Sequence, residues 1–153
     1  MSTRGLWGFY KGSITKATYN HCDSYPQGLG NEILKFIDKT CNERLNGVFS
    51  KIVMVDEDKK PTKKNIERYS KYLNLNVNKG TAKDWYCLLR KIQDDPFVYL
   101  DEIDHMINSE EFIHNSLFCE YAYIINLDEN LLEFYTGFNK VPQSKEDNRY
   151  SKE

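Results

Sequence analysis

Aromatic and β-branched residues are concentrated near the two ends of the chain, in short runs separated by turn-forming residues. Residues 6–10 and 14–19 form the first pair of runs, and a tight turn is expected between them at residues 11–13. Two runs of this composition around a tight turn predict a β-hairpin. Gly8 lies inside the first run, which predicts a bulge or a close approach of another backbone at that point.

A second pair of runs lies near the C-terminus. Residues 118–126 and 131–136 have the composition of strands, and the turn residues 127–130 separate them. This pair also predicts a hairpin. The chain is polar after position 138, which predicts a flexible tail over residues 139–153.

Between the hairpins, apolar residues recur at helical spacing. Thr62 and Thr81 are the expected N-caps of the second and third helices. We predict helices over residues 29–41, 63–73, 82–92 and 96–103, a connection over 42–47, and a strand or buried segment over 49–55, while residues 105–115 are ambiguous.

The predicted elements define an α+β fold. The two terminal hairpins can pair into one antiparallel sheet, and several helices between them then form a second layer on one face. No internal repeat and no break in composition divides the chain. We therefore expect a single α+β domain over residues 1–138.

The composition is typical of a folded globular chain, because 40% of the 153 residues are hydrophobic and 29% are charged. No apolar run approaches the roughly 18 residues that span a bilayer. The N-terminus also lacks the apolar core of a signal peptide, so we expect a cytoplasmic protein without membrane contact. The formal net charge of −2 argues against a general nucleic-acid binder.

The small net charge hides a strong asymmetry along the chain. Residues 1–91 carry a net charge of +8, whereas residues 92–139 contain 11 acidic side chains and no lysine or arginine. Two interpretations stay open. Either the basic and acidic segments pair within the fold or between the subunits of a homo-oligomer, or the basic part lines a surface that binds anions.

Four segments resemble a family of small uncharacterised proteins from phages and bacteria. Near the N-terminus they are TRGLWGF at residues 3–9 and YNHCDSYPQGLG at residues 19–30. Later in the chain they are DWYCLLR at residues 84–90 and SLFCEYAYIINLD at residues 116–128. The resemblance implies a bacterial cytosolic setting, which for a phage protein is the host cytoplasm, and it carries no assigned activity.

The loop at residues 19–25 concentrates chemically versatile side chains. Within seven residues it holds an imidazole, a thiol, a carboxylate, a hydroxyl, an amide and two phenols. Loops on a rigid hairpin often carry binding groups, and aromatic rings with a few polar groups suit a base or a sugar. The alternative is structural, with Asp23 and Ser24 forming a turn that caps the following helix.

Arg4 is a candidate for binding an anion. It lies just before a strand, beside Gly5, where a ligand can approach the backbone, and its planar guanidinium suits phosphate or carboxylate. The alternative is a salt bridge with the acidic third of the chain, for instance with Glu120. The predicted ligand-binding residues are Arg4, Trp7, Tyr19, Asn20, His21, Asp23, Ser24 and Tyr25.

No metal site and no cofactor are predicted. The three histidines are scattered, none lies at zinc-finger spacing from a cysteine, and no calcium-binding loop is present. The lysine-rich stretch from Lys59 to Lys71 includes Tyr69 and Tyr72, a pattern that can bind nucleic acid. A solvated helix face is the commoner explanation of such a stretch.

These observations favour a non-enzymatic protein that sequesters a small anionic, nucleotide-like ligand. By analogy with small phage proteins that blunt host components, a host-defence component is the expected target. One alternative is an N-terminal nucleophile amidohydrolase, in which removal of Met1 exposes Ser2 with its own amine as the base. A second alternative is an inhibitor whose acidic segment binds a partner protein by mimicking a negatively charged surface.

Overall fold

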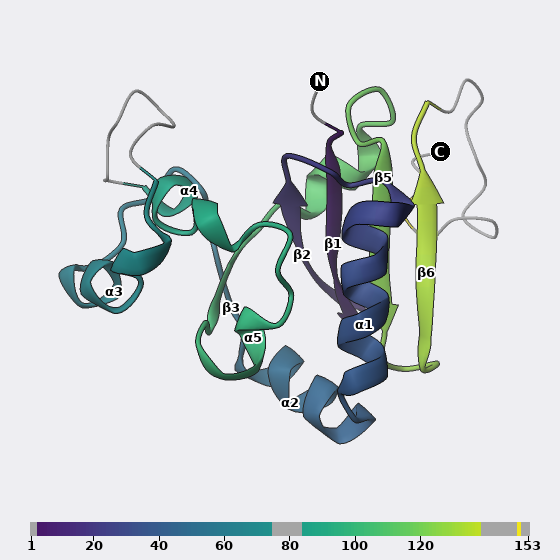
Figure 1. The fold of residues 1–153 in the computed structure, drawn as a ribbon, viewed down its shortest axis with the longest axis horizontal. Helices are drawn as coiled ribbons and strands as arrows, with labels where there is room; N and C mark the ends of the chain where they lie inside the picture. The colour runs from purple at the N-terminus through teal and green to yellow at the C-terminus, as the bar shows by residue number, and fades with distance from the viewer. Residues whose placement is uncertain (1–2, 75–83, 139–149, 151–153) are drawn as a thin grey trace.

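A four-stranded sheet forms the centre of the computed structural model, which describes residues 3–74, 84–138 and 150 (Figure 1). Its strands follow the order β2-β1-β5-β6. They are β1 (Gly5–Lys11), β2 (Ile14–Asn20), β5 (Tyr121–Asn126) and β6 (Leu131–Thr136). The predicted α+β fold, with a hairpin from each end of the chain and several helices, is confirmed.

Both hairpins form where the sequence predicts them. β1 and β2 pair antiparallel around Gly12 and Ser13, whose φ angles of 56° and 66° are those of a two-residue type I′ loop. β5 and β6 also pair antiparallel. The hairpins meet through β1 and β5, which are parallel, so the sheet is mixed and not antiparallel throughout. A parallel pair requires a long crossover, and the helical middle of the chain provides it.

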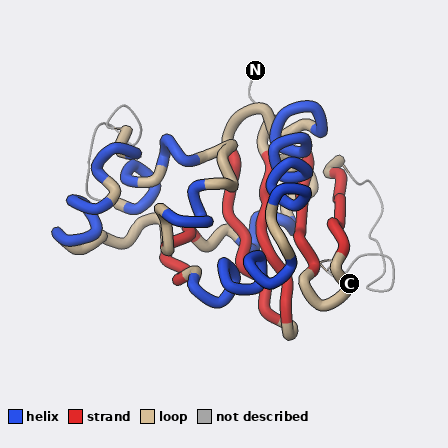
Figure 2. Tube along the Cα trace, turned by 60° about the horizontal axis from the view of Figure 1, so that its bottom comes forward, coloured by secondary structure: helices blue, strands red, loops and turns tan. Residues whose placement is uncertain are grey.

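Short elements connect the two hairpins. They are η1 (Pro26–Gly30, one π-helical turn), α1 (Asn31–Lys39), α2 (Asn42–Lys51), β3 (Val53–Val55), α3 (Lys63–Arg68), η2 (Ser70–Tyr72), α4 (Trp85–Leu88), η4 (Arg90–Ile92), α5 (Val98–Asp101), β4 (His105–Ile107) and η5 (Glu110–His114). β3 and β4 form a separate two-stranded parallel sheet. α1 crosses the face of the main sheet, whereas α3 and α4 lie beyond β2 (Figure 1, Figure 2).

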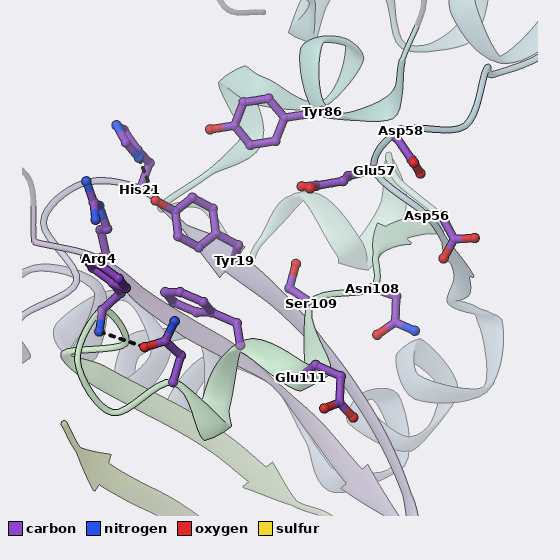
Figure 3. A pocket seen from close by; sticks show the side chains of 13 residues that line it. Arg4, Tyr19, His21, Asp56, Glu57, Asp58, Tyr86, Asn108, Ser109 and Glu111 are labelled. Atoms are coloured by element: carbon purple, nitrogen blue, oxygen red, sulfur yellow. Dashed lines mark hydrogen bonds between the residues drawn. The ribbon is translucent and has the colours of Figure 1, made fainter. Parts of the chain in front are cut away.

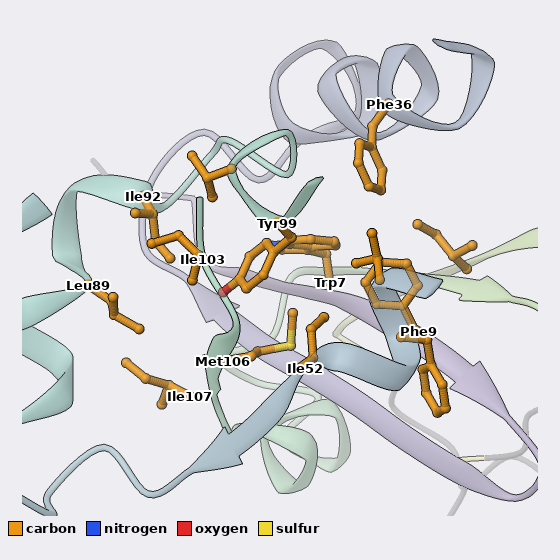
Figure 4. Close-up of a cluster of buried hydrophobic side chains, with 14 of the residues drawn as sticks. Trp7, Phe9, Phe36, Ile52, Leu89, Ile92, Tyr99, Ile103, Met106 and Ile107 are labelled. Atoms are coloured by element: carbon orange, nitrogen blue, oxygen red, sulfur yellow. The ribbon is translucent and has the colours of Figure 1, made fainter. Parts of the chain in front are cut away.

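Both faces of the main sheet are covered by apolar side chains. Trp7 and Phe9 point from β1 toward one face, where they pack edge-on against Phe36 of α1 in the larger core (Figure 4). Leu6 points to the opposite face and packs with Ile124 in a smaller cluster. This division follows from the two-residue period of a strand.

Residues 42–47 form the first half of α2 and not the predicted connection. Gly47 and the asparagines of this segment lower its helix propensity. Leu45 and Phe49 are nevertheless buried on one side of α2, and packing of that face outweighs the propensity. The predicted strand over 49–55 is correspondingly reduced to β3.

One of the two predicted N-cap residues lies within the described residues. Thr62 caps α3 as predicted, since its hydroxyl accepts a hydrogen bond from a backbone N–H of the first turn at 3.2 Å. The next helix begins at Trp85, where the Asp84 carboxylate accepts the N–H of Cys87 at 2.9 Å. Thr81, the predicted cap, lies outside the described residues. Both helices are shorter than predicted because a 3₁₀ turn follows each of them.

The charge asymmetry is partly neutralised within the chain. Four of the six ion pairs in the described part join the basic first segment to the acidic second one, and they are Arg44–Asp101, Lys51–Asp104, Arg68–Asp104 and Lys71–Glu102. Exposed pairs of this kind contribute less than about 1 kcal/mol each. Pairing within the fold therefore occurs, as part of the first interpretation predicts, whereas pairing between subunits stays a prediction.

Two further expectations concern the membrane and the tail. None of the helices in the described ranges has the length and apolar character needed to cross a bilayer. Within the predicted tail the structure describes Tyr150 alone. Its ring is buried in the smaller cluster, and its hydroxyl lies 3.1 Å from Oγ1 of Thr15.

Candidate functional site

A groove of about 830 Å³ opens beside β2 (Figure 3). The N-terminal hairpin contributes Arg4, Tyr19 and His21 to it, and the opposite walls come from residues 56–58 and 108–118. Three of the eight predicted ligand-binding residues therefore lie together, although they come from both strands of the hairpin. The groove therefore lies between the N-terminal hairpin of the sheet and the segments that follow β3 and β4.

The Arg4 guanidinium lines one end of the groove, and Arg90 lies near His21 at the same end. Arg4 is exposed, and its guanidinium lies 5.5 Å from the centre of the Phe118 ring with no carboxylate of the described residues at salt-bridge distance. Its contact with Glu120 uses the backbone N–H of Arg4, which donates to Oε2 at 2.8 Å. Arg90 of η4 lies close enough to lower the pKa of His21, and its buried Nε has no hydrogen-bond partner within the described ranges.

His21 is held by Tyr19 and Gln93. The Tyr19 hydroxyl lies 2.7 Å from Nδ1 of His21, and the backbone N–H of His21 donates to Oε1 of Gln93 at 2.8 Å. Burial, followed by the charges of Arg90 and Arg4, lowers the pKa of His21 below its usual 6.5. The ring is therefore neutral at pH 7, and when Tyr19 donates to Nδ1, Nε2 carries a proton that it can donate to an anion.

The lowered pKa values of two histidines predict how the free energy of unfolding changes with pH. Burial is the main cause that lowers the pKa of both His21 and His105 below 6.5. The folded state then binds fewer protons than the unfolded state. With respect to these two groups, the free energy of unfolding is therefore highest above pH 6.5 and decreases as the pH falls through the folded pKa values. We expect urea unfolding to show lower stability at pH 5.5 than at pH 7.5.

The double variant His21→Gln/His105→Gln is the control for this prediction. Its stability should change less with pH over the same interval, because glutamine does not titrate. A wild-type stability that is constant or rises toward pH 5.5, or an equally steep profile in the double variant, would contradict the assignment.

Aromatic rings line the middle of the groove. Tyr19 meets Phe112 edge-to-face, with ring centres 5.1 Å apart and an interplanar angle of 86°. Tyr86 contributes a second phenol from the opposite wall (Figure 3). Burial, followed by the nearby Tyr86, raises the pKa of Tyr19, so its hydroxyl stays protonated. Rings in this arrangement can stack with a planar heterocycle or cover a sugar.

The other end of the groove is acidic. Asp56, Glu57 and Asp58 lie on the loop after β3, and Glu111 lies below them with Ser109 between (Figure 3). Asp56 pairs with the exposed Lys59 at 3.4 Å. Histidine, cysteine and carboxylate side chains form no group of three that could hold a metal ion, as far as the described residues show.

Asn20 and Ser24 are buried beneath the groove and do not line it. Nδ2 of Asn20 donates to Oδ1 of Asp94 at 2.6 Å and to Oγ of Ser24 at 3.0 Å, and Oδ1 of Asn20 accepts the N–H of Asp94 at 2.9 Å. This network ties the loop that carries His21 to the segment after η4. The polar side chains of the loop thus serve both the fold and the groove.

The other predicted site residues lie elsewhere. Trp7 is 3% exposed and belongs to the core. Asp23 has a φ of 55°, and its carbonyl accepts the N–H of Leu29 at 2.9 Å, so it forms a turn before η1. Tyr25 precedes η1, is 38% exposed and does not line the groove. Ser2 lies outside the described residues.

Asn20→Ala tests the network under the groove. We expect a loss of about 3 kcal/mol in the free energy of unfolding, because the substitution removes the partner of the half-buried Asp94 carboxylate and of its N–H. Asn31→Ala is the control. The Asn31 amide is exposed and donates to the local carbonyl of Gln27, so we expect a change within about 0.5 kcal/mol. Equal losses in chemical denaturation would contradict this role of Asn20.

Several residues of the groove are not among the predicted ones. Tyr86 occurs in a segment that reads simply as an amphipathic helix, and Ser109 and Phe112 occur in the ambiguous stretch 105–115. No local signal assigns them to a site, since they reach the hairpin through the tertiary fold alone. Comparisons with protein-family models, curated proteins and solved structures found no match, so the function is inferred from the groove.

Proposed function

We propose that the protein binds and sequesters a small anionic, nucleotide-like ligand in this groove, without transforming it. The observation that carries the proposal is the cationic end of the groove. Arg4 has no carboxylate at salt-bridge distance within the described ranges, and it lines the groove together with neutral His21. A phosphate there would accept hydrogen bonds from the Arg4 guanidinium and from Nε2 of His21.

The aromatic middle of the groove supports the nucleotide part of the proposal. Tyr19, Phe112 and Tyr86 offer ring surfaces next to the cationic end (Figure 3). A nucleotide joins a phosphate to a sugar and a flat base, so its two halves match these two adjacent surfaces. A bare inorganic anion would use only the first of them.

The side chains around the groove favour binding over covalent catalysis. Nδ1 of His21 is occupied by the Tyr19 hydroxyl at 2.7 Å. No cysteine is among the described residues that line the groove. Burial also raises the pKa of the Cys87 thiol to about 11 and that of Cys119 to about 12, so neither supplies a thiolate at neutral pH. In this proposal a phage-type protein removes the ligand from the host cytoplasm, as a homo-oligomer and as an antagonist of host defence.

Two measurements on the purified protein test the proposal. Heat denaturation should release a bound nucleotide that mass spectrometry identifies, or, if the protein is purified empty, a panel of nucleotides should raise its melting temperature. The corresponding nucleosides should raise it less, because they lack the phosphate. An empty protein whose melting temperature does not respond to any member of the panel would refute the proposal.

A further inference from the structure

The groove is polarised along its length, and this polarity restricts the ligand. Arg4 and His21 lie at one end, and Asp56, Glu57 and Asp58 lie at the other, with the aromatic rings between them (Figure 3). Among the described residues that line the groove, Arg4 carries the one permanent positive charge, because His21 is neutral at pH 7. Glu57, Asp58 and Glu111 line the groove as well, together with Asp56, which pairs with Lys59.

From this polarity we infer that the groove selects a nucleotide with a single phosphate group and discriminates against triphosphates, with the sugar or base donating hydrogen bonds to the carboxylate end. This inference rests on the proposed function and narrows its ligand class. The Arg4 guanidinium and Nε2 of His21 suffice for one phosphate. The described lining of the groove includes no other lysine or arginine. The added charge of a longer phosphate chain would therefore face the carboxylates of the same groove, and like charges at close range weaken binding.

The acidic end also indicates what the rest of the ligand carries. Carboxylates are pure hydrogen-bond acceptors, so they favour ligand atoms that donate, such as ribose hydroxyls or the amino group of a base. Glu57 is the best placed of them. It borders the main groove and also a narrow recess of about 20 Å³ behind Tyr19 and Tyr86, and its backbone carbonyl accepts the N–H of Tyr86 at 3.4 Å. The Glu57 backbone is thus held beside an aromatic wall.

The experiment compares adenosine, AMP and ATP by isothermal titration calorimetry in metal-free buffer with a chelator, so that no cation masks the phosphate charge. We expect AMP to bind at least tenfold more tightly than ATP and more tightly than adenosine. In the double variant Glu57→Gln/Asp58→Asn the preference for AMP over ATP should fall severalfold. Glu43→Gln, on the exposed start of α2, is the matched control and should keep the preference.

The outcomes separate this inference from the proposed function. If AMP and ATP bind equally well, or if the double variant keeps the full preference for AMP, the inference on charge selection is wrong while nucleotide binding stands. If none of the three compounds binds, or if adenosine binds as well as AMP, the proposed anion site fails and the inference fails with it.

Discussion

Replacing Gly8 with alanine should destabilise the protein by about 3–5 kcal/mol, a loss typical of a severe steric clash in the core. Gly8 lies in the central strand β1 opposite Ala17 of β2. A Cβ at this position would lie 2.8 Å from Cβ of Ala17 and even closer to the backbone carbonyl of Lys16. Backbone atoms of a paired strand cannot move aside without breaking the ladder, so the hairpin itself must distort.

Gly47→Ala provides a control with the same chemical change. Gly47 lies on an exposed position of α2, where an added Cβ meets no atom within 4 Å. Alanine should stabilise the helix there by about 0.5–1 kcal/mol, because glycine loses more backbone entropy on folding. Chemical denaturation of both variants measures the contrast. A loss at position 8 no larger than 1 kcal/mol would show that the strands are not as close as described.

Arg4→Ala should weaken the binding of AMP by about 10- to 100-fold, the range expected for removing one charge-assisted contact. The melting temperature of the free protein should hardly change, because the side chain is exposed and its guanidinium lies over the Phe118 ring without an ion pair to the described residues. Isothermal titration calorimetry gives the affinity, and a thermal melt without ligand gives the stability. Both measurements together separate a binding role from a structural one.

Arg44→Ala is the matched control for that substitution. Arg44 is also an exposed arginine, but it pairs with Asp101 on the α2–α5 side of the molecule. The Arg44→Ala substitution removes the same charge from the protein as Arg4→Ala, so both variants share any long-range electrostatic effect. If Arg44→Ala weakened AMP binding as much as Arg4→Ala, the binding would depend on net charge and not on the groove.

The hairpins were predictable because their information is local. The turn at Gly12 and Ser13 and the alternation along β2 lie within a few residues of each other. The parallel pairing of β1 with β5 joins Gly5 to Tyr121, and no local pattern specifies how two hairpins meet. α2 was missed for the opposite reason, since local propensity disfavours a helix that burial of its apolar face stabilises.

The candidate site was predictable on one side only. Arg4, Tyr19 and His21 come from the hairpin, and their residue types in a dense polar loop already indicated an anion and a ring as ligand parts. The sequence prediction assigned Asn20 to the same site, because no local pattern shows that its partner is Asp94, which lies 74 positions away in the chain. The same separation along the chain hides the acidic wall, which would give the proposed anion site a preferred direction.

The position of the ligand is tested most directly by nuclear magnetic resonance during a titration with AMP. We predict that the side-chain resonances of Arg4 Nε and of the His21 and Phe112 rings shift with a common saturation curve. Those of Lys35, exposed on α1, should stay in place. Saturable shifts confined to α1, or no shift at Arg4 and His21 when AMP is in large excess, would contradict binding in the groove.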